Sequence, residues 1–220
     1  MYPPFSSSRR SNSRSTLKGS FSIVPGQLPL QSAFIGESNS STEFFCTNRD
    51  LALKTNTEFI KTSCGATTYP KLCLASLSSQ ASVIQTSPKL IACAAFNVTL
   101  SSAKSTSTMM LRLSHGHGMK PREVAAMRDC VELLSDSVDE LQRSISKMVN
   151  FRSSGFELMI SDVQTWVSAA LTDEGTCSDG FAGNGLNGNL KTVVRGRIVN
   201  IAQLTSNALA LINRYASVHS

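Results

Sequence analysis

Apolar residues between positions 121 and 148 recur at alternating steps of three and four residues. This spacing predicts one long amphipathic helix that packs in a bundle or coiled coil. Its apolar positions are Val124, Met127, Val131, Leu134, Val138, Leu141, Ile145 and Met148. Pro121 suits the first position of this helix, because a residue in the first turn needs no intrahelical partner for its backbone N–H.

Three other segments also have helical periodicity. Ser87 and Pro88 predict an N-cap and a first helical position, and this helix should run to about Leu113. Ser154 and Glu157 fit a capping box at the start of the next helix. The apolar positions of the two later helices are Phe156, Ile160, Val163, Val167 and Ala170, then Val194, Ile198, Ile201, Thr205, Ala208, Ile212 and Tyr215.

Four long amphipathic helices with short links, and no segment with strand alternation, predict an all-α fold, an up-and-down four-helix bundle. A short helix from Glu58 to Cys64 and a second one from Pro70 should form an N-terminal α-hairpin beside the bundle. We expect this domain to span residues 57–216. Residues 1–56 are rich in Ser, Asn and Thr without sustained periodicity, which predicts a disordered or processed extension.

The cysteine spacing indicates two covalent clamps on this bundle. Cys64 and Cys73 flank the turn of the hairpin, Cys130 lies in the 121–148 helix, and Cys177 is expected in the turn after the next helix. Two disulfides, Cys64–Cys73 and Cys130–Cys177, would suit an oxidising compartment; four reduced, buried thiols are the alternative. The first pair is too far apart for the usual zinc-ligand spacing, so we expect no metal site.

Two further cysteines have no predicted partner. Cys93 falls inside the 88–113 helix among alanines and is expected to be a free, buried thiol. Cys46 lies in the predicted extension.

The net charge of +6 divides evenly, with +3 in residues 1–56 and +3 in residues 57–220. From this balance we expect no concentrated cationic face and hence no nucleic-acid partner. Mild basicity is compatible with acidic partners or an anionic polysaccharide matrix. No apolar run is long enough to predict a membrane span.

The chain has no motif that predicts catalysis. It lacks a nucleophile-elbow Ser and a phosphate-binding loop, and two of its three histidines, His115 and His117, share one loop. We therefore expect neither an enzyme nor a bound cofactor. The Leu, Ile, Val and Met seam predicts a filled core, which argues against a hollow carrier of lipids or other small ligands.

Two features concern processing and location. Asn97, followed by Val98 and Thr99, forms an N-glycosylation sequon within a predicted helix. Residues 1–36 contain basic residues and many serines but no acidic residue, which is typical of an organellar transit peptide, and they lack the apolar run of a secretory signal. The cysteines indicate secretion and this leader indicates an organelle, so both locations remain open.

Several motifs, in this order, resemble the plant invertase/pectin methylesterase inhibitor family. They are Phe59 to Cys64, Tyr69-Pro70-x-x-Cys73, Asp129-Cys130, Thr165 to Asp173, Thr176 to Phe181, and Ser206 to Leu211. The resemblance implies a four-helix bundle with an N-terminal α-hairpin, and pairing of the four matching cysteines first with second and third with fourth.

The resemblance also implies a function. Members inhibit pectin methylesterase or acid invertase in stoichiometric complexes, and in the former group the bundle covers the enzyme's active-site cleft. The absence of a Pro-Lys-Phe tripeptide and the sequence of residues 166–181 favour pectin methylesterase as the target enzyme. Inhibition of cell-wall or vacuolar acid invertase is the alternative. The implied location is the apoplast or cell wall.

We expect polar residues of the 88–113 and 121–148 helices to touch the enzyme, the alternative being ordinary solvent-facing surface. These residues are Ser101, Lys104, Thr108, Asp136, Asp139 and Arg143. Protonation of Asp136 or Asp139 at an acidic wall pH would then change the affinity.

Overall fold

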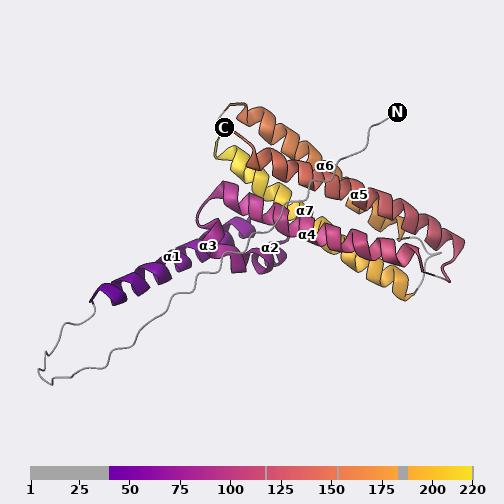
Figure 1. Ribbon diagram of the computed structural model, residues 1–220, viewed down its shortest axis with the longest axis horizontal. Coiled ribbons are helices and arrows are strands. Elements are labelled where there is room, and N and C mark those ends of the chain that lie inside the picture. The colour runs from indigo at the N-terminus through magenta and orange to yellow at the C-terminus, as the bar shows by residue number, and fades with distance from the viewer. Residues whose placement is uncertain (1–39, 117, 153, 183–187, 220) are drawn as a thin grey trace, which may run out of the picture. The chain divides into compact units, whose positions relative to one another are not determined.

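The computed structural model describes residues 40–116, 118–152, 154–182 and 188–219, with side chains from Arg49 onward. Within these ranges the regular elements are all helical and no strand occurs (Figure 1). They are α1 (Ser40–Gly65), α2 (Pro70–Leu77), a 3₁₀ turn (Ser78–Gln80), α3 (Ala81–Ile84), α4 (Pro88–Ser114), α5 (Pro121–Val149), α6 (Phe156–Gly180) and α7 (Asn189–Ser217).

Helices α4 to α7 form the predicted four-helix bundle. Helix α4 packs against α5 and α7, and α6 packs against the same two helices, so each bundle helix has two neighbours (Figure 1). Helices α1 and α2 form the predicted N-terminal hairpin, and α2 contacts both α4 and α7. The all-α fold predicted from the hydrophobic periodicity is confirmed.

Three of the four helix starts predicted from a proline or a cap are confirmed, because α2, α4 and α5 begin at Pro70, Pro88 and Pro121. The Ser87 hydroxyl accepts a 3.3 Å hydrogen bond from the backbone N–H of Leu90, as an N-cap does. Helix α6 differs, because the residue before its first turn is Gly155 in a left-handed conformation, with φ of 82° and no side-chain cap. The predicted capping box between Ser154 and Glu157 is therefore wrong: the glycine, which adopts positive φ without strain, takes the capping position.

The buried side of α5 is rotated relative to the predicted seam. Its buried positions are Met127, Cys130, Leu134, Ser137, Leu141, Ser144 and Met148. Val131, Val138 and Ile145 are only partly buried, and Val124 is 47% exposed. Small residues instead occupy the side that faces α6, where the Cα atoms of Cys130 and Cys177 lie 4.6 Å apart. An approach this close excludes larger side chains.

Helix α1 is longer than predicted. It begins at Ser40 rather than near Glu58, so residues 40–56 are helical and the prediction of disorder is wrong for this stretch. Leu51 and Leu53, which are 63% and 49% exposed, do not form an apolar seam. Once the disulfide-linked end of a helix is held in place, each added residue costs little free energy, which permits the extension. Residues 1–39 of the predicted extension lie outside the described residues.

Both expected disulfides are present. Cys64–Cys73 joins α1 to α2, and Cys130–Cys177 joins α5 to α6. Cys177 lies inside α6 rather than in the following turn, because packing against α5 outweighs the weak helix propensity of the nearby glycines. Cys93 is free and half-buried. The side chain of Cys46 is outside the described part.

Candidate functional site

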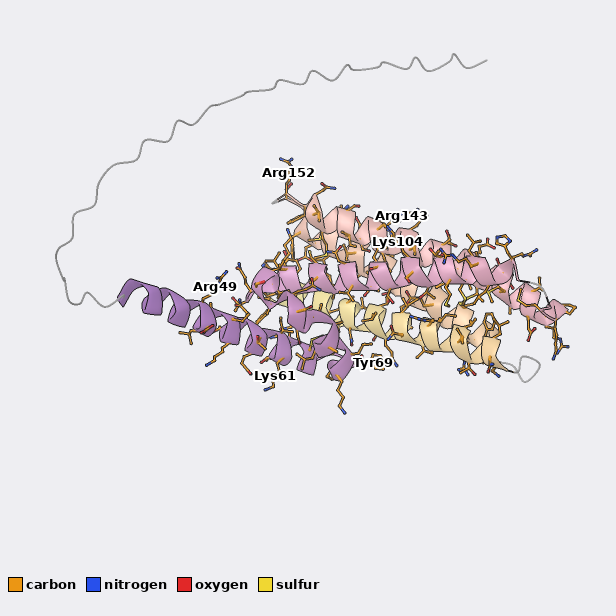
Figure 2. The ribbon with its side chains drawn as sticks, turned by 60° about the horizontal axis from the view of Figure 1, so that its bottom comes forward. Arg49, Lys61, Tyr69, Lys104, Arg143 and Arg152 are labelled. Carbon is orange, nitrogen blue, oxygen red and sulfur yellow. A yellow bond between two sulfur atoms is a disulfide. The ribbon has the colours of Figure 1, made fainter. Side chains whose placement is uncertain are left out.

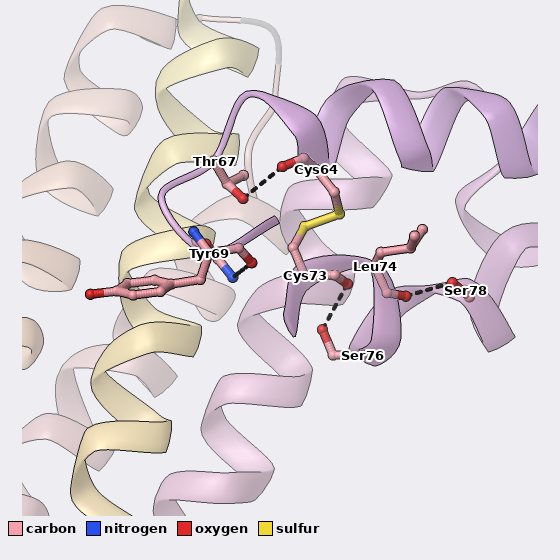
Figure 3. The surroundings of a disulfide bond; sticks show 8 residues. Cys64, Thr67, Tyr69, Cys73, Leu74, Ser76 and Ser78 are labelled. Carbon is pink, nitrogen blue, oxygen red and sulfur yellow. Dashed lines mark hydrogen bonds between the residues drawn. A yellow bond between two sulfur atoms is a disulfide. The ribbon is translucent and has the colours of Figure 1, made fainter. Parts of the chain in front are cut away.

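The hairpin turn is held on α7 by one amide side chain. Asn207 accepts a 3.0 Å hydrogen bond from the backbone N–H of Tyr69 and donates a 3.0 Å bond to the carbonyl of the same residue. Asn207 is 2% exposed, so both bonds are shielded from water. The Cys64–Cys73 disulfide lies beside this turn (Figure 3), and together they give the hairpin a defined position on the bundle.

A buried carboxyl group lies between three bundle helices. Glu174 of α6 has no solvent exposure, and its Oε1 accepts hydrogen bonds from the hydroxyls of Ser137 on α5 (2.8 Å) and Thr205 on α7 (3.0 Å). Its Oε2 is buried and has no hydrogen-bond partner among the described residues. Burial raises the pKa of Glu174 to about 7, against the lowering effect of the two hydroxyl bonds.

Other carboxyl groups extend this acidic region to the surface between α5 and α6. Burial, together with the neighbouring charges of Asp173 and Asp136, raises the pKa of Glu140 to about 7, and Arg143 acts in the opposite direction. The pKa of Asp173 is raised by burial and by Asp136. Sequence reasoning missed Glu140, Asp173 and Glu174, because only the packing of α6 on α5 brings them together.

The predicted contact residues divide into separate groups. Lys104 of α4 donates a 2.9 Å hydrogen bond to Oε1 of Gln142 on α5, whose Nε2 donates a 3.3 Å bond to Asp139. We call Lys104, Asp139 and Gln142 the polar ridge. Arg143, the next residue of α5, instead lines a hollow that Trp166 of α6 also borders; Figure 2 labels Lys104 and Arg143. Gln142 was not among the predicted residues, although it provides the link between the charged side chains of Lys104 and Asp139.

The other three predicted contact residues have different neighbours. Asp136 belongs to the acidic region near Asp173 and Glu140. Ser101 and Thr108 are three and four residues from Lys104 on α4, and each lines a hollow that Arg197 of α7 also borders. The predicted contact residues therefore have more than one local environment.

The charges of the bundle are segregated by helix. Helices α4 and α7 contain seven basic residues and no Asp or Glu. Helix α5 has six acidic residues against four basic ones, and α6 has five acidic residues and no Lys or Arg. A charge balance averaged along the chain hides this difference between the two helix pairs.

The remaining predicted features are placed as follows. Asn97 is exposed on α4, whereas Thr99 is fully buried and its hydroxyl donates to the Ala95 carbonyl at 2.8 Å. His115 is exposed at the end of α4, and His117 is outside the described residues.

Within the described ranges, no group of three or more His, Cys, Asp or Glu could hold a metal ion. None of the described helices has the length and apolar character that a membrane span requires.

Comparison with known proteins gives consistent results. Residues 58–211 match the family described as plant invertase/pectin methylesterase inhibitor. A 21 kDa protein of Daucus carota is 47% identical over 74% of this chain and 86% of its own length. Pectinesterase inhibitors 10 and 11 of Arabidopsis thaliana are 50% and 48% identical over 74% and 72% of this chain, and over 53% and 80% of their own lengths.

A solved structure supports the fold independently. The crystal structure of a mutant form of an Arabidopsis pectin methylesterase inhibitor superposes with a TM-score of 0.58 and 22% identity, covering 70% of this chain and 95% of that one. The clamped helical bundle, the motifs around its cysteines and the match over residues 58–211 lead to one conclusion: the chain belongs to the plant invertase/pectin methylesterase inhibitor family.

Proposed function

We propose that this protein inhibits a pectin methylesterase by forming a stoichiometric complex in which its bundle covers the active-site cleft. The observation that carries the proposal is the identity of 50% and 48% to two proteins named pectinesterase inhibitors. These names describe inhibitors rather than enzymes, in agreement with the expectation of a non-catalytic protein. They also favour pectin methylesterase over acid invertase as the target.

The architecture suits inhibition by steric occlusion. The bundle helices α5 and α6 are joined by a disulfide, and Asn207 fixes the hairpin on α7. A surface that is already ordered loses little conformational entropy on binding, so more of the contact free energy appears as affinity.

The polar ridge is the part of the predicted contact surface that we propose to touch the enzyme. Its Lys104–Gln142–Asp139 hydrogen bonds hold a cation and an anion in fixed positions on two adjacent helices. Fixed charges of both signs discriminate between partners, because a wrong partner leaves one of them facing a like charge.

Titration of the full chain against a purified pectin methylesterase and, in parallel, an acid invertase tests the target. We expect loss of pectin methylesterase activity with a sharp equivalence point and no effect on invertase. Inhibition of invertase alone would contradict the proposal.

Substitutions test the ridge separately. Lys104→Ala and Asp139→Ala should each weaken inhibition by about tenfold, as for charged contacts at the centre of an interface. Arg122→Ala, which removes an exposed charge near the start of α5, is the matched control and should leave inhibition unchanged. Equal effects of all three changes would exclude the ridge as the contact.

We also propose export to the cell wall, with residues 57–216 as the inhibitor domain. Two disulfides agree with an oxidising compartment, where such bonds persist. Expression of the full chain with a C-terminal fluorescent tag in plant cells tests the location. Signal in the wall after plasmolysis supports it, and signal in plastids or mitochondria supports the organellar alternative.

A further inference from the structure

Two adjoining hollows lie along α4, on the side that faces α7. The first, of about 660 Å³, lies between α2, α4 and α7, and the second, of about 580 Å³, continues it along α4 and α7. Ser105, Thr106 and Arg197 line both. We call the pair the α4–α7 groove; its polar lining includes Asn97, Ser101, Ser105, Arg112, Arg197 and Asn200.

The groove offers hydrogen-bond donors and positive charge but no carboxylate. None of its lining residues is Asp or Glu, and neither α4 nor α7 contains one. Arg112 and Arg197 are both exposed and form no ion pair with any described residue. Two unpaired guanidinium groups at one hollow favour a ligand with a planar carboxylate, which a guanidinium binds through two parallel hydrogen bonds.

The first hollow has a different chemistry. Asn97, Asn200 and Ser101 present amide and hydroxyl groups that both donate and accept hydrogen bonds. Leu72 and Leu204 contribute apolar surface beside them. Polar groups of both kinds next to an apolar wall suit a sugar ring, which has hydroxyls at its edge and C–H groups on its faces.

The groove is elongated, which indicates a chain rather than a single sugar. Asn97 and Arg112 lie at opposite ends of it on α4, about 22 Å apart at the helical rise per residue. No aromatic residue lines it, so it lacks the stacking surfaces by which proteins bind single-stranded nucleic acid.

We propose that the α4–α7 groove binds a linear acidic oligosaccharide built of galacturonate units. The uronate carboxylate lies between Arg112 and Arg197, and neighbouring units lie along Asn97, Ser101 and Asn200. The choice of galacturonate rests on the proposed function, because de-esterification by a pectin methylesterase creates these carboxylates. The groove and the polar ridge adjoin on α4, because Thr108, which lines the groove, is one helical turn from Lys104 of the ridge.

Isothermal titration of the full chain with an oligogalacturonide of defined length tests the proposal. The protein should be made without glycans and with its disulfides intact, because Asn97 borders the groove. We expect saturable binding that weakens with added salt, since salt screens exposed charges. The double variant Arg112→Gln/Arg197→Gln should bind at least tenfold more weakly, as expected when charged hydrogen bonds are lost.

The matched control is Arg122→Gln/Arg128→Gln, which removes the same charge from exposed positions on α5. It should bind within about twofold of the unchanged protein, a change worth only a few tenths of a kcal/mol. Absence of binding, equal weakening in both double variants, or equal affinity for a fully methyl-esterified oligomer would each overturn the proposal. Equal affinity for a phosphate polyanion would also overturn it, by showing general attraction of anions.

An inhibition assay on the same proteins separates this proposal from the proposed function. The groove variant should still inhibit pectin methylesterase acting on a short substrate. If the unchanged protein inhibits no pectin methylesterase but binds the oligogalacturonide through the two arginines, the proposed function fails and the groove proposal stands. The opposite outcome, inhibition without this binding, overturns the groove proposal alone.

Discussion

Ser137 of α5 donates a 2.8 Å hydrogen bond to Glu174 of α6, and both side chains are fully buried. The contact lies where small residues of α5 allow α6 to approach, two turns along α5 from Cys130. Glu174 is therefore in a region that cannot relax easily, with one carboxyl oxygen that has no partner among the described residues. A negative charge here is costly, which is why the pKa of Glu174 is raised to about 7.

Folding stability should fall as the pH rises from about 4.5 to about 7. In this window the unfolded chain has lost the Glu174 proton, whose ordinary pKa is 4.5, whereas the folded chain retains it. The folded state binds more protons, so the free energy of unfolding should decrease by roughly 1 kcal/mol per pH unit from this group. Urea unfolding at pH 4.5, 6 and 7.5 measures the slope.

Glu174→Gln should flatten that slope, because its amide cannot ionise. A constant, pH-independent decrease in the free energy of unfolding is expected, because the new amide N–H groups are buried without partners. Part of the slope should remain because the pKa of Glu140 is also raised. Glu157→Gln, at an exposed position of the same helix, should keep the full slope; identical slopes for both variants would rule out Glu174 as the source.

The titration of Glu140 should respond in opposite directions to two neighbouring changes. Asp173→Asn removes a negative charge that raises the pKa of Glu140, so the midpoint should fall. Arg143→Gln removes a positive charge that lowers it, so the midpoint should rise. Carboxyl ¹³C NMR measures both. Shifts of the same sign would contradict this arrangement of charges.

Removing the disulfides should have unequal effects. Cys130 and Cys177 are 47 positions apart in sequence, so replacing both by Ala should reduce the free energy of unfolding by about 4 kcal/mol through the entropy of the unfolded chain. Cys64 and Cys73 are 9 apart, which predicts a loss of about 3 kcal/mol. Denaturant unfolding of the two double variants measures the difference. A greater loss from the hairpin pair would contradict the chain-entropy explanation.

Loss of the Asn207 amide should loosen the hairpin turn. Asn207→Ala removes both hydrogen bonds to the backbone of Tyr69, at a cost of about 1–3 kcal/mol, and should speed amide exchange at Tyr69. The control is Asn213→Ala on the same helix, whose exposed amide accepts only from Gln164. It should change stability by less than about 0.5 kcal/mol. Unchanged exchange at Tyr69 in Asn207→Ala would show that the disulfide alone holds the turn.

Helix starts and the bundle itself could be predicted from local patterns. Ser87 and Pro88 identify the start of α4, and the three-four spacing identifies α5 as a bundle helix, because capping and amphipathicity act within a few residues. The same spacing did not decide which side of α5 is buried. The spacing predicts that Val138 is buried, whereas the structure buries the neighbouring Ser137, which contacts α6.

The α4–α7 groove and the polar ridge differ in how far they could be predicted from the sequence. The sequence shows that residues 88–114 and 189–217 contain no Asp or Glu. This absence leaves the groove without carboxylates only because α4 and α7 are neighbours. The link from Lys104 through Gln142 to Asp139 joins side chains that are far apart in sequence, so no local pattern contains it.

The sequence by itself determined the helices, the cysteine positions and the family, since these depend on local spacing and on motifs that stay readable in the unfolded chain. The tertiary structure decided which carboxyl groups are buried together, which basic residues share a groove, and where Cys177 lies. Those properties depend on distances between segments remote in sequence. Such distances are set by how closely the helices pack. A small side chain such as Ser137 permits a close approach of α6 to α5, which a valine at the same position would prevent.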